Sequence, residues 1–162
     1  MILESIEKNT LKRLCRETSL PTVLRSARVP YTAAQMFDLV NDIESYPQFL
    51  HWCTGAHVDS RQGSMIEATI DIGVVGFHRA FRTRNTLTRP ERIQIELVSG
   101  PFRRLRGEWR FQDLADGGSD VALSLAFEVT MSPFGVLFSK VFEELAKSQM
   151  SAFISRAKKL YG

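Results

Sequence analysis

The chain has 162 residues, of which 44% are hydrophobic and 24% are charged, as expected for one globular domain with a substantial core. No apolar run approaches the ~18 residues that span a bilayer. Acidic residues near the N-terminus argue against a signal or transit peptide, so we expect a cytoplasmic location. The net charge is only +3, and the two cysteines offer no disulfide framework.

The chain begins with a mixed-charge segment, residues 1–21, which we predict to be a poorly ordered N-terminal extension of the domain at 22–162. Alternating residues at 22–29 then predict a first strand. The spacing of Thr32 and Gln35 is that of a capping box and predicts the start of a helix. Asn41-Asp42 should interrupt this helix, and a second short one should follow before Pro47.

From about residue 54 to residue 129 the hydrophobic period is two, which predicts a run of antiparallel strands. Apolar and polar residues alternate in each strand, and Gly, Pro and Asp residues lie between them. Such regular alternation is typical of a sheet with one wetted face. The alternation predicts a long strand at 77–88 and further strands at 66–72, 93–97, 104–111 and 121–129, with a shorter one at 54–60.

The last segment has the signals of one long helix. Ser132 can cap it and Pro133 suits its first turn. An apolar stripe from Phe134 to Leu160 includes Leu137, and Lys158 with Lys159 suits the negative C-terminal end. At ~28 residues the helix would be roughly 40 Å long. It therefore needs a wide partner, and the apolar face of the sheet supplies one, in an α+β two-layer domain.

The order of these elements resembles the START-like superfamily, also called the polyketide cyclase-like group. Local motifs resemble one branch of it, the coenzyme Q-binding proteins of mitochondria and the bacterial ribosome association toxins. The match extends over about residues 23–162 and is carried by Val29-Pro30-Tyr31, Ser45-Tyr46-Pro47-Gln48-Phe49-Leu50, Cys53, Gly100-Pro101-Phe102, Leu105, Trp109, Phe111, Ala152-Phe153, Arg156-Ala157 and Leu160-Tyr161-Gly162. His51 and Ser99 depart from the branch pattern, which commonly has proline and aspartate there.

The resemblance implies a helix-grip fold, with a curved antiparallel sheet of about six or seven strands over the long C-terminal helix. It also implies an apolar tunnel between the two layers. In relatives such a tunnel accepts lipids, polyketides or an isoprenoid quinone. The expected function is therefore non-enzymatic binding, transport or chaperoning of a quinone or related lipid in support of respiration, with no required cofactor. The alternative is a ribosome association toxin that binds the large ribosomal subunit, and a cyclase-type enzyme ranks last.

Residues of inward parity, meaning those at the alternate strand positions that should face the helix, are the candidates for ligand contact. Each of them also fits plain core packing. Leu125 shares this parity. The polar residues among these candidates are the more informative ones, because a quinone offers acceptor oxygens and no donor. Arg79 should also point inward, near a strand end. The ligand-binding candidates are Phe49, Trp52, Ile70, Ile72, Phe81, Thr83, Asn85, Ile95, Leu97, Phe102, Trp109, Phe111, Phe138, Phe142, Leu145 and Gln149.

Large apolar residues crowd the loop at 46–52, which fits either a lid over the open end of the sheet or a gate with transient membrane contact. His51, Cys53 and His57 are close in sequence but lack a further ligand at metal-site spacing, so we predict no metal site. Cys53 fits a small packed hydrophobe better than a nucleophile. We find no catalytic set of residues.

Arginines of outward parity in the strands predict a basic surface. It fits a solvated sheet face or contact with phosphates, because the planar guanidinium suits phosphate groups. The expected partners are therefore a hydrophobic small molecule and, in the alternative, the ribosome and its RNA, but not DNA. The residues of this surface are Arg82, Arg84, Arg104, Arg106 and Arg110.

Overall fold

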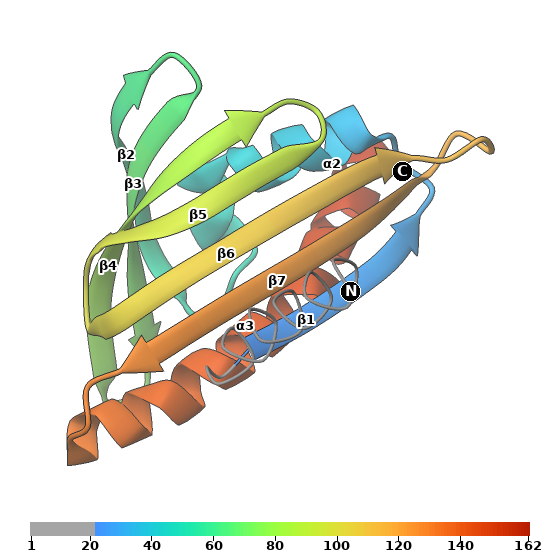
Figure 1. Cartoon of the computed structure of the whole chain (residues 1–162). Helices are drawn as coiled ribbons and strands as arrows, with labels where there is room; N and C mark the ends of the chain where they lie inside the picture. The colour runs from blue at the N-terminus through green and yellow to red at the C-terminus, as the bar shows by residue number, and fades with distance from the viewer. Residues whose placement is uncertain (1–21) are drawn as a thin grey trace, which may run out of the picture.

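The computed structural model describes residues 22–162, so the extension predicted at 1–21 lies outside the described residues. A seven-stranded antiparallel sheet curves around one long helix (Figure 1). The strand order is β1-β7-β6-β5-β4-β3-β2. The strands are β1 (Thr22–Val29), β2 (Cys53–Gln62), β3 (Met65–Val74), β4 (Phe77–Thr88), β5 (Arg92–Ser99), β6 (Phe102–Asp113) and β7 (Ser119–Val129). This arrangement confirms the expected helix-grip fold.

Two short helices follow β1. Helix α2 (Ala33–Asn41) begins with the predicted capping box, in which the Gln35 amide donates to Thr32 Oγ1 (3.1 Å) and the Thr32 amide donates to Gln35 Oε1 (2.9 Å). The 3-10 helix η1 (Ile43–Gln48) follows and includes Pro47, so it extends one residue beyond the proline expected to end it.

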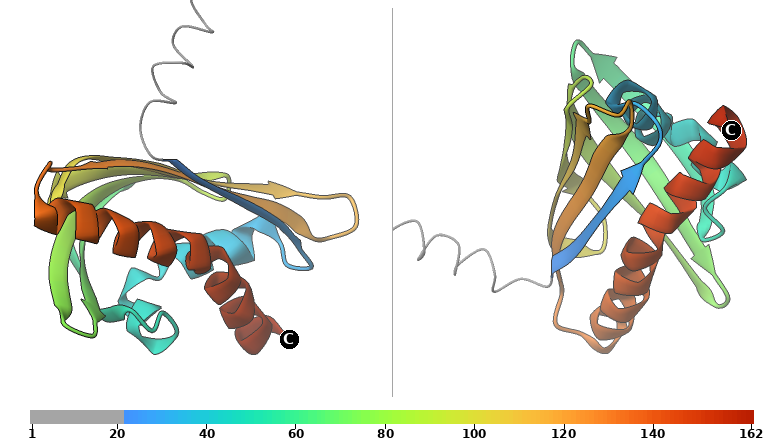
Figure 2. Two further views of the ribbon diagram at one scale, coloured as in Figure 1. Left: turned by 90° about the horizontal axis from the view of Figure 1, so that it is seen from below. Right: turned by 90° about the vertical axis from the view of Figure 1, so that its right-hand side faces the viewer.

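Helix α3 (Pro133–Tyr161) crosses the concave face of the sheet (Figure 2). The Gly135 amide donates to Ser132 Oγ (2.9 Å), as the predicted N-cap requires. Leu137 and Leu160 were expected on the buried stripe, but they are 54% and 50% exposed. The buried stripe is narrower because its members recur every three or four residues: Gly135, Phe138, Phe142, Ala146, Met150, Phe153 and Ala157.

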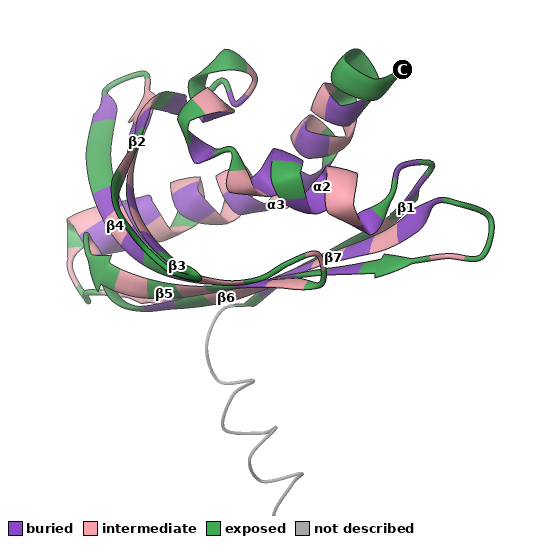
Figure 3. Ribbon diagram, turned by 90° about the horizontal axis from the view of Figure 1, so that it is seen from above, coloured by how far each residue is buried: buried purple, intermediate pink, exposed green. Residues whose placement is uncertain are grey.

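The two faces of the sheet differ as the alternation predicted. On β6, Leu105 and Trp109 are buried beneath α3, whereas Arg104 and Arg106 are exposed on the convex face (Figure 3). Strand β2 is longer than its sequence pattern because register shifts between Cys53 and Gly55, and between Val58 and Ser60, break the alternation. Among the described helices, none has the length and apolar character needed to cross a bilayer.

Candidate functional site: a cavity between the sheet and the long helix

Two hollows lie along the C-terminal helix. The inner cavity measures about 70 Å³ and is enclosed between the sheet and α3. An open groove of about 750 Å³ lies outside it, between the loop after η1, the β3–β4 turn and α3. Trp52 and Leu145 line both hollows and therefore separate them. The inner cavity is lined by Ile43, Tyr46, Trp52, Ile70, Phe81, Thr83, Asn85, Ile95, Leu105, Trp109, Leu125, Phe142, Leu145, Ala146 and Gln149.

A small residue on α3 accounts for the position of the cavity. Phe142 packs against the Phe102 and Phe127 rings at centroid distances of 4.8 and 4.9 Å. Further along α3, Phe153 packs against Trp109 at 5.3 Å. Between these aromatic contacts the buried residues of α3 are Ala146, which lines the cavity, and Met150, which does not. The methyl group of Ala146 leaves space that a phenyl ring would fill.

The polar side chains in the cavity come from β4, β6 and α3. Thr83 and Asn85 are 4% and 8% exposed, and Thr83 Oγ1 donates to Asn85 Oδ1 (3.1 Å). Within residues 22–162 no hydrogen bond engages the Asn85 amide nitrogen, the Gln149 amide or the indole N–H of Trp109. Asn85 and Trp109 are buried and Gln149 is half-buried, and donors removed from solvent are usually satisfied by a partner. The cavity therefore offers hydrogen-bond donors within an apolar wall.

The structure brings most of the candidate ligand residues to one place. Those that line the inner cavity are Trp52, Ile70, Phe81, Thr83, Asn85, Ile95, Trp109, Phe142, Leu145 and Gln149. Phe49 lines the outer groove instead. Ile72, Leu97, Phe102, Phe111 and Phe138 pack in or against the core without lining either hollow. Ligand contact by any of these residues stays a prediction.

Sequence reasoning missed Ile43, Tyr46, Leu105 and Ala146 as cavity residues. Leu105 has the inward parity of its strand, so alternation alone could have found it. Ala146 lies four residues after Phe142, and a small residue on a buried helical face is the signal for space. Arg79 lies near the start of β4 on the side of the sheet that faces α3, as expected, with its guanidinium 4.3 Å from the Phe134 ring centroid, but it is exposed and does not line the cavity.

The loop at 46–52 is fixed to α3 on one side. Arg156 donates to Gln48 Oε1 (2.8 Å), and its guanidinium lies 5.2 Å from the Phe49 ring centroid. The hydroxyl of Tyr46 donates to the Val40 carbonyl, and burial raises the pKa of Tyr46 above its usual range. The loop therefore places Trp52 over the cavity, in the position of a lid.

Cys53 and its histidine neighbours do not form a reactive cluster. Burial raises the pKa of the Cys53 thiol to about 11, so the thiol is protonated at neutral pH. Its Sγ donates to the Gly55 carbonyl (3.2 Å). His51 and His57 are both exposed. In the part of the chain that the structure describes, no three His, Cys, Asp or Glu side chains are grouped as metal ligands.

The predicted basic surface is largely ion-paired. Glu67 lies 2.5 Å from Arg82 and 2.8 Å from Arg84, and the hydrogen bond from Arg84 lowers the pKa of that carboxyl. Arg104 lies 3.7 Å from Glu128. Arg106 is exposed and has no ion pair with any residue from 22 to 162.

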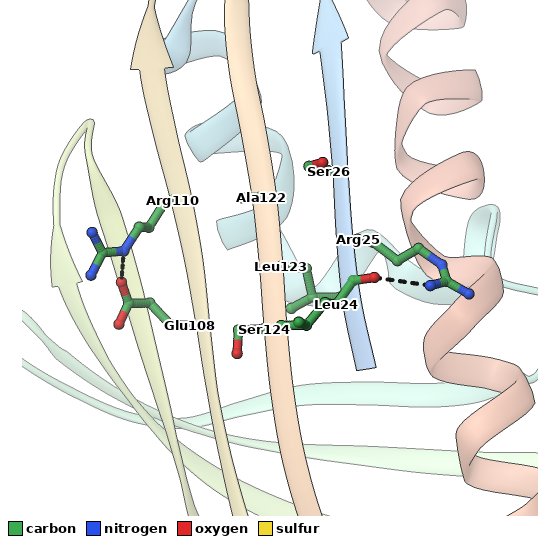
Figure 4. A pocket seen from close by; sticks show the side chains of 8 residues that line it. All are labelled: Leu24, Arg25, Ser26, Glu108, Arg110, Ala122, Leu123 and Ser124. Carbon is green, nitrogen blue, oxygen red and sulfur yellow. Dashed lines mark hydrogen bonds and ion pairs between the residues drawn. The ribbon is translucent and has the colours of Figure 1, made fainter. Parts of the chain in front are cut away.

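Arg110 borders a shallow depression of about 410 Å³ on the convex face, where it pairs with Glu108 (Figure 4). Small side chains on the central strand of this region, including Ala122 and Ser124, leave the depression open. An acidic partner on the same face lowers the net positive charge there. The convex face is thus of mixed charge, and Arg106 and Arg92 are two of its cations without an ion pair among residues 22–162.

Comparison with solved structures matches this architecture. The chain superimposes on the Zhui aromatase/cyclase from Streptomyces sp. R1128 with a TM-score of 0.75 at 15% identity, covering 86% of this chain and 94% of that one. It matches a START superfamily protein from Mycobacterium smegmatis with a TM-score of 0.72 at 21% identity, covering 86% and 98% of the two chains. These likenesses establish the fold.

Comparison with curated sequences identifies nearer relatives. The ribosome association toxin RatA of Escherichia coli K12 is 40% identical over 148 residues, which is 91% of this chain and 94% of that protein. The mitochondrial coenzyme Q-binding protein COQ10 homolog B of Xenopus laevis is 24% identical over 152 residues, covering 86% of this chain and 62% of that protein. Residues 29–154 match the family model for polyketide cyclase / dehydrase and lipid transport. The chain therefore belongs to the polyketide cyclase / dehydrase and lipid transport family, in the branch that contains RatA.

Proposed function

We propose that this protein binds an apolar ligand that carries acceptor oxygens, an isoprenoid quinone or a related lipid, and holds it without catalysing a reaction. The observation that carries the proposal is the apolar cavity in which the Asn85 amide nitrogen, the Gln149 amide and the Trp109 indole N–H have no partner among residues 22–162. A quinone carbonyl accepts hydrogen bonds and donates none, so it complements these donors. The distant likeness to a coenzyme Q-binding protein supports the same ligand class.

The size of the cavity limits how such a ligand can be held. Small-molecule sites usually measure roughly 300–1,000 Å³, whereas the inner cavity measures about 70 Å³. The outer groove of about 750 Å³ adjoins it across Trp52 and Leu145. Rotation of these two side chains would join the hollows. The head group would then occupy the inner cavity beside Asn85, and the tail would leave through the groove.

The cavity wall supports binding over catalysis. Its lining, which lies entirely within the described residues, contains no Asp, Glu or His that could act as a general acid or base. We further propose that the protein carries its ligand in the cytoplasm and so supports respiration.

Fluorescence offers a direct test, because both tryptophans of the chain line the cavity. Titration with a short-tailed ubiquinone should quench the emission in a saturable way. Trp109→Phe and Trp52→Phe, tested singly, should each lose the share of quenching that comes from the ring removed. Linear quenching that equals the quenching of free N-acetyltryptophanamide would show that no site exists.

A second function, association with the large ribosomal subunit, is favoured by the 40% identity to RatA over 91% of the chain. The convex face supports it through Arg106, which is exposed and has no ion pair with any residue from 22 to 162. The test is co-sedimentation with ribosomal subunits in sucrose gradients. The triple variant Arg104→Glu, Arg106→Glu, Arg110→Glu should abolish it, and unchanged binding would exclude this face.

A further inference from the structure

Exposed apolar side chains gather at one end of the molecule, where β7 leads into α3. Val75 at the β3–β4 turn is fully exposed, and Met131, between β7 and α3, is 89% exposed. The first turns of α3 add Val136 and Leu137, which are about half exposed, and β5 adds Val98. We call this set, Val75, Val98, Met131, Val136 and Leu137, the apolar tip.

The segments that carry the apolar tip lie side by side although they are far apart in sequence. The Phe77 ring, two residues after Val75, stacks on Phe134 of α3 at 5.6 Å between centroids. The Phe102 ring at the start of β6 packs on Phe138 at 5.0 Å. The β3–β4 turn, the β5–β6 turn and the start of α3 meet at the same end of the sheet (Figure 1).

The charge at this end has one sign. The segments 73–80, 98–104 and 129–142 contain no Asp or Glu. They carry exposed Arg79, Arg103 and Lys140. The adjoining acids are each paired with a base: Glu128 lies 3.7 Å from both Arg103 and Arg104, and Glu143 and Glu144 lie 3.1 and 3.5 Å from Lys147. Arg79 is held against the Phe134 ring at 4.3 Å and keeps its guanidinium at the edge of the apolar tip.

The apolar tip also continues into the ligand route. Val75 and His78 line the outer groove, and the groove adjoins the inner cavity at Trp52 and Leu145. Apolar side chains ringed by cations are the arrangement by which proteins bind the surface of an anionic bilayer. A groove that opens beside these apolar side chains and cations would lead from the acyl-chain layer of the bilayer toward the cavity.

We propose that the apolar tip docks on anionic lipid bilayers, with its apolar side chains among the acyl chains and Arg79, Arg103 and Lys140 at the headgroup phosphates. The proposal goes beyond ligand binding in the cavity and needs no ligand for its test. Vesicle binding can therefore fail while the fluorescence titration succeeds, and the reverse also holds.

Flotation of lipid vesicles through a sucrose gradient tests the docking. Vesicles of phosphatidylcholine with 30% phosphatidylglycerol should carry the full-length protein, and pure phosphatidylcholine should carry far less. Leu137→Asp and Met131→Asp should each weaken binding at least about tenfold, the effect of withdrawing one apolar side chain from the bilayer. Lys140→Gln should weaken binding to anionic vesicles about fivefold and leave binding to neutral vesicles unchanged.

Leu24→Asp is the matched control, because Leu24 is an equally exposed apolar residue (64%) on β1, away from the apolar tip. It should bind vesicles like the wild type. Equal loss in Leu24→Asp and Leu137→Asp would contradict the location. Failure of the wild type to float with anionic vesicles would overturn the proposal. A wild-type dimer in sedimentation velocity that Leu137→Asp dissociates, without vesicle binding, would assign the surface to a second copy instead.

Discussion

Two parts of the layer between the sheet and α3 differ although the same strands and the same helix form both. Near the start of α3, the rings of Phe77, Phe81, Phe102, Phe127, Phe134, Phe138 and Phe142 form one aromatic cluster, with neighbouring centroids 4.8 to 6.4 Å apart. In the middle of α3, Ala146 and the polar side chains of Thr83, Asn85 and Gln149 surround the inner cavity.

The difference shows how one layer can supply both stability and a binding site. The aromatic cluster is close-packed and contributes dispersion and apolar burial. The cavity gives up packing and keeps donors without protein partners, which costs stability unless another molecule satisfies them. We therefore expect substitutions in the aromatic cluster to change stability and substitutions around the cavity to change ligand binding.

Phe138→Ala should have the largest effect on stability. Phe138 is fully buried and its ring contacts four other rings of the aromatic cluster. Its loss should reduce the free energy of unfolding by about 3–5 kcal/mol in urea denaturation. The neighbour Leu137 is 54% exposed, and Leu137→Ala should change that free energy by less than about 0.5 kcal/mol. Similar losses in both variants would contradict the proposed packing.

Substitution of Thr83 alone should lower the free energy of unfolding, and adding a substitution of Asn85 should raise it again. Thr83→Val removes the donor to Asn85 Oδ1 and leaves a buried acceptor unpaired, which should cost about 1–3 kcal/mol in the free energy of unfolding. Adding Asn85→Leu removes that acceptor and should restore most of the loss. The double variant should also bind the short-tailed quinone less tightly than the wild type. A double variant less stable than the single one would refute this account of the pair.

Removal of Arg156 should loosen the lid. Arg156→Leu deletes the hydrogen bond to Gln48 and the contact with the Phe49 ring. Each is worth on the order of 1 kcal/mol, so a bound quinone should dissociate about tenfold faster in stopped-flow fluorescence. Arg156→Lys keeps the positive charge, so its quinone dissociation rate should lie between those of the wild type and Arg156→Leu. An unchanged dissociation rate would show that ligand exchange does not use this loop.

The smallest effect concerns an ion pair outside both regions. Arg89 donates to both carboxylate oxygens of Asp38 (2.8 Å each), and this hydrogen bonding lowers the pKa of Asp38. Because the pKa of Asp38 is lower in the folded state than in the unfolded state, ionised Asp38 stabilises the fold at pH values above the ordinary aspartate pKa. That stabilisation is lost as the pH falls through the folded-state pKa. Asp38→Asn should therefore lower Tm slightly at pH 7. The difference from the wild type should vanish near pH 2, and a difference that grows in acid would have the wrong sign.

The sequence predicted the fold well because its signals are local. Alternation located the strands, and the Thr32–Gln35 and Ser132–Pro133 signals located the helix starts. The cavity was harder to predict, because parity shows which face a residue occupies and not whether packing is complete. Phe138 and Phe142 share one face of α3, yet only Phe142 lines the cavity. That difference depends on Ala146 and on contacts between strands distant in sequence.

The basic surface shows the same limit. Outward parity was predicted correctly for Arg84 and Arg110, but each faces an acid on the same face of the sheet. Glu67 on β3 meets Arg84 on β4 only through the strand register. Arg110 instead meets Glu108 on its own strand, two residues away. Counting the arginines alone therefore overestimates the net charge of the face.

The most direct test of the binding site is mass spectrometry of organic extracts from protein purified natively, with wild type and Ala146→Leu side by side. The larger side chain should fill the inner cavity of about 70 Å³. Because the added atoms enter a cavity, the free energy of unfolding should change by no more than the roughly 1–3 kcal/mol that extra methylene groups cost in a packed core. Ala34→Leu on α2, outside the cavity, is the control. The account predicts a quinone or related lipid with the wild type and with Ala34→Leu, and none with Ala146→Leu. An extract of the wild type without such a molecule, or equal amounts from all three proteins, would contradict it.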